Sequence, residues 1–239
     1  MKLSIAMTAY NQPGYLARTL ESLSRCSGIS NAVLSVCVEP TNPEVVEMIR
    51  SIRFMETRVT VNQDRLGCQP NTLQAWTKGF EISDFVVYMD DDQMVAPDTL
   101  AYFEYCRRRY EKDPAVFSAT AYTRNRAPVD RAAYYTVGTR PWFTSLVPAL
   151  WRDRWDRIRT QWNKDGRGWD LNVNEGVRGH LLEVHPFLSR VQNIGTENGE
   201  HVKDPAWHKE FVHNEFWAGL PGLALEVLDK ADLWRTRED

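Results

Sequence analysis

The feature that most constrains this fold is an apolar run that ends in three consecutive acids. Residues 85–89 read Phe-Val-Val-Tyr-Met, and Asp90, Asp91 and Asp92 follow directly. A run of apolar β-formers is typical of a strand buried on both faces, which would deliver the acids to the edge of a sheet. Adjacent carboxylates repel one another and need a cation, and oxygen ligands favour Mn²⁺ or Mg²⁺. The alternative is an acidic surface turn in which Asp98 caps the next helix.

The composition is typical of a globular protein with one α/β core and a smaller appended region. The chain has 239 residues, of which 43% are hydrophobic, and its net charge is −3. No stretch approaches the roughly 20 apolar residues of a membrane span, and residues 1–10 alternate like a strand instead of forming a signal peptide. We therefore expect no membrane span and a cytoplasmic location. The four cysteines are scattered without a C-x-x-C pair, which argues against a zinc site or disulfide bonds.

Strand-like and helix-like segments alternate along the first half of the chain. The predicted strands cover residues 2–8, 32–38, 58–61, 85–89 and 116–120, and the predicted helices cover 15–24, 45–52, 71–80 and 97–110. This alternation predicts an α/β fold with a doubly wound, mostly parallel, Rossmann-like sheet. Beyond residue 122 the pattern loosens, and we expect a loop over 123–140 and an amphipathic helix over 146–161.

Polar and acidic residues follow the predicted strands at the points where each one ends. They are Asn11 after the first strand, Glu39 after the second, Asp64 after the third and the three acids after the fourth. The carboxyl ends of parallel strands line one crevice, where open α/β sheets bind ligands, so we expect these residues to bind a nucleotide. The glycine-rich phosphate loops of other nucleotide-binding proteins are missing from the sequence. A metal would therefore hold the phosphates.

Three segments of the first half carry a family likeness. They are residues 4–23, residues 62–67 with the helix after them, and residues 88–103, which read Tyr-Met-Asp-Asp-Asp-Gln-Met-Val-Ala-Pro-Asp-Thr-Leu-Ala-Tyr-Phe. The first two resemble the family-2 glycosyltransferases of the GT-A fold. The third is similar to the Glu-Asp-Asp motif of the N-acetylglucosaminyltransferases that begin complex N-glycans, with Asp90 in place of Glu. The likeness covers the first 120 residues and resumes weakly near residues 185–190.

This resemblance implies a single GT-A catalytic domain over residues 1–239. Residues 1–122 would form the half that binds a nucleotide-sugar, which we expect to be a UDP-sugar. Residues 123–239 would form a helical and loop-rich half that binds the acceptor, with a lid near 193–204. In such a domain the metal is Mn²⁺ or Mg²⁺.

The resemblance also implies roles for individual residues. Asp92 would bind the metal directly, while Asp90 and Asp91 would contact the ribose or metal-bound water. Asp90 and His201 are further candidate metal ligands. The residues expected to meet the nucleotide are Thr8, Ala9, Tyr10, Asn11, Glu39 and Asp64, and those expected to meet the diphosphate are Arg190 and either His201 or His208.

An inverting transfer needs a carboxylate within hydrogen-bond reach of the acceptor hydroxyl, where it acts as a general base. In the family this acid follows an aromatic residue between the acidic motif and the Ser-Arg segment. The Trp169-Asp170 pair matches best, and Asp153 and Asp156 are the other candidates.

The acceptor side has an unusual composition. Residues 104–172 hold 14 lysines and arginines against 8 aspartates and glutamates, and five of the nine tryptophans fall within residues 142–169. Such a region can bind a polyanion or stack on sugar rings, or it can be amphipathic helices whose tryptophans fill the core. The acceptor can be a glycan, a small molecule or a modified nucleic acid. Two other functions stay open, a nucleotidyltransferase and a non-catalytic glycan- or nucleic-acid-binding protein.

Overall fold

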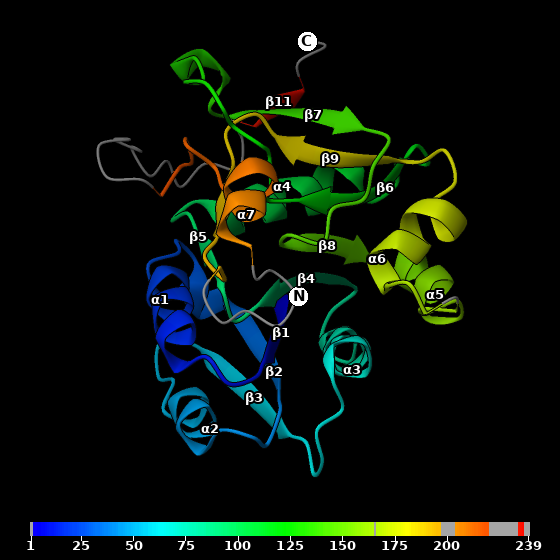
Figure 1. The fold of residues 1–239 in the computed structure, drawn as a ribbon. Helices are drawn as coiled ribbons and strands as arrows, with labels where there is room; N and C mark the ends of the chain where they lie inside the picture. Colours follow the sequence, from blue (N-terminus) through cyan, green and yellow to red (C-terminus); the bar gives the residue numbers. More distant parts are fainter. Residues whose placement is uncertain (1, 165, 197–203, 220–233, 237–239) are drawn as a thin grey trace.

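A nine-stranded mixed sheet forms the centre of the computed structural model, which describes residues 2–164, 166–196, 204–219 and 234–236 (Figure 1). The strand order is β11-β7-β9-β6-β8-β4-β1-β2-β3, and β5 and β10 form a separate two-stranded sheet. The strands are β1 (Leu3–Ala9), β2 (Ala32–Val38), β3 (Glu56–Val61), β4 (Phe85–Asp90), β5 (Gln93–Val95), β6 (Val116–Thr120), β7 (Thr136–Arg140), β8 (Pro148–Trp151), β9 (Leu182–Pro186), β10 (Val191–Asn193) and β11 (Arg235–Thr236). The helices are α1 (Pro13–Ser24), α2 (Pro43–Arg50), α3 (Cys68–Phe80), α4 (Thr99–Tyr110), α5 (Arg152–Arg159), α6 (Trp169–Asn172) and α7 (Pro205–Phe211).

Helices cover both faces of the sheet because the central strands are apolar on both sides. Ile5 and Met7 of β1 pack in one cluster with residues of α1, α2 and α4, whereas Ala6 packs in a second cluster with residues of α3 and α5 (Figure 1). β1 pairs in parallel with β2 and β4, and β2 pairs in parallel with β3. The predicted α/β class and the parallel, doubly wound first half are therefore confirmed.

The second cluster takes up three of the five tryptophans within residues 142–169, namely Trp155, Trp169 and the partly buried Trp162. Trp76 of α3 stacks on Tyr88 and on Trp155, and Trp169 meets Trp76 edge to face. Trp151 is also buried, whereas Trp142 is half exposed. The tryptophan-rich composition is thus mainly core packing, as in the second of the two interpretations.

Two predictions for the second half are wrong in part. The expected helix over 146–161 is a strand, β8, followed by the shorter helix α5, and β8 pairs antiparallel with both β4 and β6. All four residues of β8 are buried, and an apolar run of this length suits a strand between two others as well as a helix. The expected loop over 123–140 contains β7, which pairs antiparallel with β9. In the part of the chain described, no helix is long and apolar enough to cross a membrane.

A buried ion pair joins the start of α4 to the turn before β10. Arg190 and Asp98 are both buried, with the Arg190 Nε 3.0 Å from each Asp98 carboxylate oxygen. The guanidinium also donates to the carbonyls of Leu188 and Tyr134. Asp98 stands at the position of the α4 cap, but its side chain makes no capping hydrogen bond.

We predict that Asp98→Ala lowers the free energy of unfolding by about 3–5 kcal/mol, because it leaves the Arg190 charge buried without its partner. Urea denaturation of the two proteins measures the difference. The matched control is Asp84→Ala, which removes an exposed ion pair with Arg152 and should cost at most about 1 kcal/mol. Equal losses in the two variants would contradict a structural role for the buried pair.

Candidate active site

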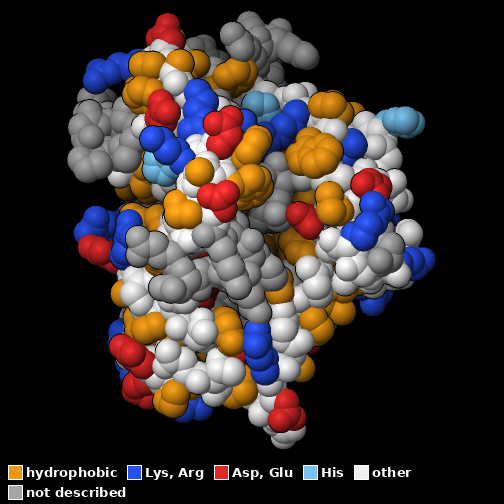
Figure 2. Space-filling view, in the orientation of Figure 1, with side chains coloured by type: hydrophobic (Ala, Val, Ile, Leu, Met, Phe, Trp, Pro, Cys, Tyr) orange, Lys and Arg blue, Asp and Glu red, His pale blue; other side chains and the backbone are white. Residues whose placement is uncertain are grey.

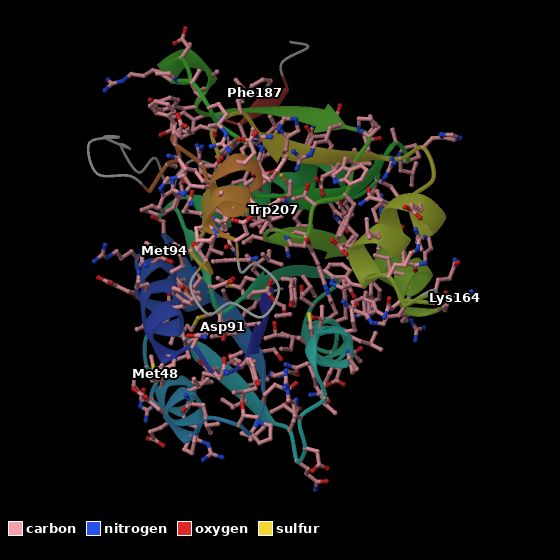
Figure 3. All side chains as sticks on the ribbon, viewed as in Figure 1. Met48, Asp91, Met94, Lys164, Phe187 and Trp207 are labelled. Carbon is pink, nitrogen blue, oxygen red and sulfur yellow. The ribbon has the colours of Figure 1, made fainter. Side chains whose placement is uncertain are left out.

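A cavity of about 820 Å³ lies at the carboxyl ends of β1, β2 and β4. It gathers most of the residues that the sequence placed after these strands. The predicted residues that line it are Thr8, Ala9, Tyr10, Asn11, Glu39, Asp90, Asp91 and Asp92. Figure 3 labels Asp91 near the middle of the molecule, beside the ends of these strands, whereas Lys164, which follows α5, lies at its edge.

Neutral groups hold the first two acids of the cluster. Asp90 Oδ1 accepts hydrogen bonds from Thr8 Oγ1 at 2.9 Å and from the Tyr88 hydroxyl at 2.5 Å. Gln93 Nε2 donates to Asp90 Oδ2 at 3.1 Å, and Asp91 Oδ2 accepts from the backbone N–H of Tyr10 at 2.9 Å. The last residue of β4 is thus tied to β1, which fixes the floor of the cavity.

The third acid, Asp92, is held by a segment of the second half. Asn193 Nδ2 donates to Asp92 Oδ1 at 3.0 Å, and the Ile194 N–H donates to the Asp92 carbonyl at 2.8 Å because β10 pairs antiparallel with β5. A Cβ atom on Gly195 would lie 1.8 Å from Asp92 Oδ2. The backbone therefore approaches the carboxylate so closely that only glycine fits at residue 195.

The electrostatics of the cluster favour a bound cation. Burial, together with the Asp90 charge, raises the pKa of Asp91 to about 7. Burial and the charges of Asp90 and Asp91 raise the pKa of Asp92 to about 8. A divalent cation beside these groups would relieve both the loss of hydration and the repulsion.

The donor set fits Mn²⁺ or Mg²⁺ held jointly by protein and ligand. The acids are hard oxygen donors, which these ions prefer. Within the described residues, no three His, Cys, Asp or Glu side chains form a group that could hold a metal ion. The protein would thus supply part of the coordination shell and leave room for phosphate and water oxygens, as is common for Mg²⁺ in nucleotide sites.

The opposite wall of the cavity is a loop anchored by Glu39. The buried Glu39 carboxylate accepts from the backbone N–H groups of Leu66 and Gly67 at 3.0 and 2.9 Å, and from Asn62 Nδ2 at 3.1 Å. These bonds fix the turn that carries Arg65, whose guanidinium lies 4.6 Å above the centre of the Tyr10 ring. Both Glu39 oxygens thus hold this loop at the cavity wall, and the expected contact of Glu39 with the nucleotide stays a prediction.

Asp170 lies beside the cavity, on α6. Ser145 lines the cavity and places its hydroxyl oxygen 3.4 Å from Asp170 Oδ2. Asn174 donates to the Asp170 carbonyl and forms two hydrogen bonds with the backbone of Phe143. The segment before β8 and the start of α6 are therefore held together. Asp170 is not among the described residues that line the cavity, but its carboxyl contacts Ser145, which does.

The structure places several of the other predicted residues elsewhere. Asp153 and Asp156 pair with Arg154 and Arg159 on α5, with their own side chains exposed to solvent, so they are not suited to act as the general base. Asp64 is exposed in its loop and is not among the described residues that line the cavity.

The basic residues expected at the diphosphate need a similar correction. Arg190 is enclosed in its pair with Asp98 and has no exposed surface, so it does not meet a diphosphate. His201 lies outside the described residues. His208 is buried behind Asn193, with its Nε2 3.0 Å from Asn193 Oδ1.

Sequence reasoning missed a further group of cavity residues. They are Gln12, Tyr15, Arg65, Gly67, Cys68, Asn71, Thr72, Gln93, Ser145, Leu146, Asn193 and Gly195. Arg65 lies in a segment quoted for the family likeness. Asn193 and Gly195 lie in the segment 193–204 that was expected to form a lid, of which residues 197–203 lie outside the described residues. Ser145 and Leu146 gave no signal, because they come from a segment whose strand was not predicted.

We predict that Glu39→Gln lowers the free energy of unfolding by about 1–3 kcal/mol, because its amide N–H₂ would face a backbone N–H donor in a buried place. Urea denaturation measures the loss, and Glu47→Gln, an exposed change on α2, should stay within about 0.5 kcal/mol of wild type. Unchanged stability combined with weaker nucleotide binding would instead restore the expected contact between Glu39 and the nucleotide.

Comparisons with known proteins agree with this geometry. A curated relative from Arabidopsis thaliana, alpha-1,3-mannosyl-glycoprotein 2-beta-N-acetylglucosaminyltransferase, is 27% identical over 112 residues, which are 46% of this chain and 24% of the relative. The chain thus spans about a quarter of that protein's length. The structure of residues 1–349 of TarS from S. aureus in complex with UDP aligns with a TM-score of 0.56 at 14% identity, covering 77% of this chain and 60% of that one.

A second structure of TarS residues 1–349 also has a TM-score of 0.56, at 11% identity over 78% of this chain and 60% of that one. These likenesses confirm the GT-A type of α/β fold. The family model described as glycosyltransferase like family 2 matches residues 2–139, which is more than half of the chain. The chain therefore belongs to the family-2-like glycosyltransferases.

Proposed function

We propose that this domain transfers a sugar from a nucleotide-sugar to an acceptor hydroxyl, with inversion at the anomeric carbon and with Mn²⁺ or Mg²⁺ bound. The observation that carries the proposal is the convergence of Asp90, Asp91 and Asp92 on one cavity at the ends of parallel strands. Family membership supports sugar transfer as the reaction. The UDP in the TarS structure supports a UDP-sugar as the donor.

The first half of the chain would bind the donor. Asp92 is the proposed direct metal ligand, with Asp90 beside it, while Asp91 stays bonded to the Tyr10 N–H and contacts metal-bound water or the ribose. The bound metal would supply positive charge to the leaving phosphate oxygen. Tyr10, Asn11 and Arg65 line the part of the cavity nearest the Glu39 loop, where they would flank the base.

The second half, residues 123–239, would bind the acceptor. Asp170 is the proposed general base, which accepts the proton of the acceptor hydroxyl as that oxygen attacks the anomeric carbon. The Ser145 hydroxyl and the Asn174 amide hold the start of α6 in place. His201 stays a candidate ligand from the sequence, outside the described residues.

The charge of the acceptor side does not favour a polyanion as the acceptor. Arg140 pairs with the buried Glu183, and Arg154, Arg159 and Arg167 also pair with acids. On the face shown in Figure 2, lysine and arginine side chains alternate with acidic ones and form no continuous basic patch. A glycan or a small molecule therefore suits this side better than a nucleic acid.

We predict that UDP together with Mn²⁺ raises the melting temperature of the protein more than either does alone. The phosphates of UDP would supply oxygen ligands to Mn²⁺, and Mn²⁺ would supply positive charge to the phosphates. A thermal-shift panel of nucleotides and nucleotide-sugars with and without Mn²⁺ measures this effect. Asp92→Asn should abolish the metal-dependent part, while Asp64→Asn, an exposed change in the 62–67 loop, should leave it intact. A full shift in Asp92→Asn would overturn the metal site.

We predict that Asp170→Asn lowers kcat for sugar transfer by about 10²–10⁴-fold, the usual contribution of a general base, and leaves UDP affinity unchanged. Single-turnover transfer assays and UDP titration separate the two effects. Asp156→Asn, an exposed change on α5, is the matched control. Release of pyrophosphate in place of UDP would show a nucleotidyltransferase, and donor binding without any turnover would show a non-catalytic binding protein.

A further inference from the structure

The Asp92 carboxylate is connected to the buried imidazole of His208 through a single side-chain amide. Asn193 Nδ2 donates to Asp92 Oδ1 at 3.0 Å, and His208 Nε2 lies 3.0 Å from Asn193 Oδ1. Asn193 and His208 are both buried. The three side chains come from the turn after β4, from β10 and from α7, so the connection joins the two halves of the chain at the acid cluster.

The hydrogen bonds of the Asn193 amide allow only one orientation. Its oxygen accepts from the Gly195 N–H at 3.1 Å and faces His208 Nε2, while its nitrogen faces the carboxylate of Asp92. Turning the amide over would set its oxygen against a carboxylate and its N–H₂ against the Gly195 N–H. His208 must therefore donate from Nε2, with the proton on that nitrogen.

The backbone around His208 keeps the imidazole in place. The Val212 and His213 N–H groups both donate to the His208 carbonyl at 2.8 Å, and the side chain of Asp204 caps the start of α7 by accepting from the Ala206 N–H. At the other end, Asn193 is fixed opposite Gln93 by the β5–β10 pairing. Because both ends are fixed, the amide between them can hold one rotamer of Asp92.

We propose that Asn193 and His208 are positioning residues that hold the Asp92 carboxylate in the orientation that binds the metal. His208 acts through Asn193 and does not bind the metal itself. This inference rests on the proposed function, since it takes the acid cluster as the metal site. Carboxylates that bind metals are commonly oriented by hydrogen bonds from a second layer of residues, and losing such a partner typically costs about 10–100-fold in metal affinity.

The test measures the affinity for Mn²⁺ of the protein without bound nucleotide-sugar. The electron paramagnetic resonance signal of unbound Mn²⁺ gives this affinity. We expect His208→Leu and Asn193→Ala each to weaken binding by about tenfold or more. His208→Gln keeps an N–H donor near the position of Nε2 and should bind close to wild type. His213→Leu is the matched control, because His213 is bonded to Gln192, the neighbour of Asn193 on β10, and should leave the affinity unchanged.

A double-mutant cycle keeps the test decisive if one variant is poorly folded. If His208 acts through the amide, His208→Leu should cause no further loss in protein that already carries Asn193→Ala. Additive losses would overturn the inference. Thermal unfolding of each variant should show similar losses for His208→Leu and His213→Leu, although only the first changes the metal affinity.

Three further outcomes would overturn this inference, and one of them would overturn the proposed metal site as well. If His208→Gln binds Mn²⁺ as weakly as His208→Leu, the imidazole is a metal ligand and not a positioning residue. If Asp92→Asn binds Mn²⁺ as tightly as wild type, the metal does not occupy this cluster, and the proposed function loses its metal site together with this inference. If Asp92→Asn weakens Mn²⁺ binding but His208→Leu does not, this inference is overturned while the proposed metal site stands.

Discussion

The crowding of three adjacent, half-buried carboxylates at the end of β4 is the constraint that the surrounding structure meets. Hydroxyl, amide and backbone N–H groups from β1, β4, β5 and β10 donate to these acids. They leave the pKa values of Asp91 and Asp92 well above those of ordinary aspartates. Donors of this kind orient the acids but do not neutralise them, and a site of this kind is suited to a divalent cation and the phosphates that come with it.

The two halves of the chain share one sheet, and this explains why the cavity draws on both. β8 inserts between β4 and β6, and the segment before it contributes Ser145 and Leu146 to the cavity at the ends of β1, β2 and β4. On the other side, the small β5–β10 sheet brings Asn193 and Gly195 onto Asp92. Residues that approach the acids thus come from far along the sequence.

The tryptophans within residues 142–169 show that one composition is compatible with either ligand binding or core packing. Trp155 and Trp169 look like sugar-stacking residues in the sequence, yet they pack around Trp76 and close the core over α3. Arg190 looks like a phosphate ligand, yet its guanidinium is enclosed by Asp98 and by the carbonyls of Leu188 and Tyr134. In each case the residue type was compatible with ligand binding, but the groups that the side chain contacts in the folded protein gave it a structural role.

The predictions that succeeded depend on short-range patterns. Apolar runs and helical spacing place the strands and helices of the first half, and parallel strands necessarily bring their carboxyl ends to one edge, so Thr8 through Asn11, Glu39 and Asp90 through Asp92 could be placed at one cavity. Glu39 was placed correctly, although its bonds to the Leu66 and Gly67 N–H groups could not be foreseen, because they depend on how the loop folds back.

By itself, the sequence determined the fold class, the family and the position of the acid cluster, because these follow from local periodicity and from contiguous residues. Only the tertiary structure decided that Asp153 and Asp156 are exposed in ion pairs on α5 while Asp170 contacts Ser145 of the cavity wall, since all three acids have similar neighbours in the sequence. It also decided that Asn193 and His208 stand behind Asp92. Contacts between residues about one hundred positions apart depend on strand pairing and core packing, and no local pattern in the chain records them.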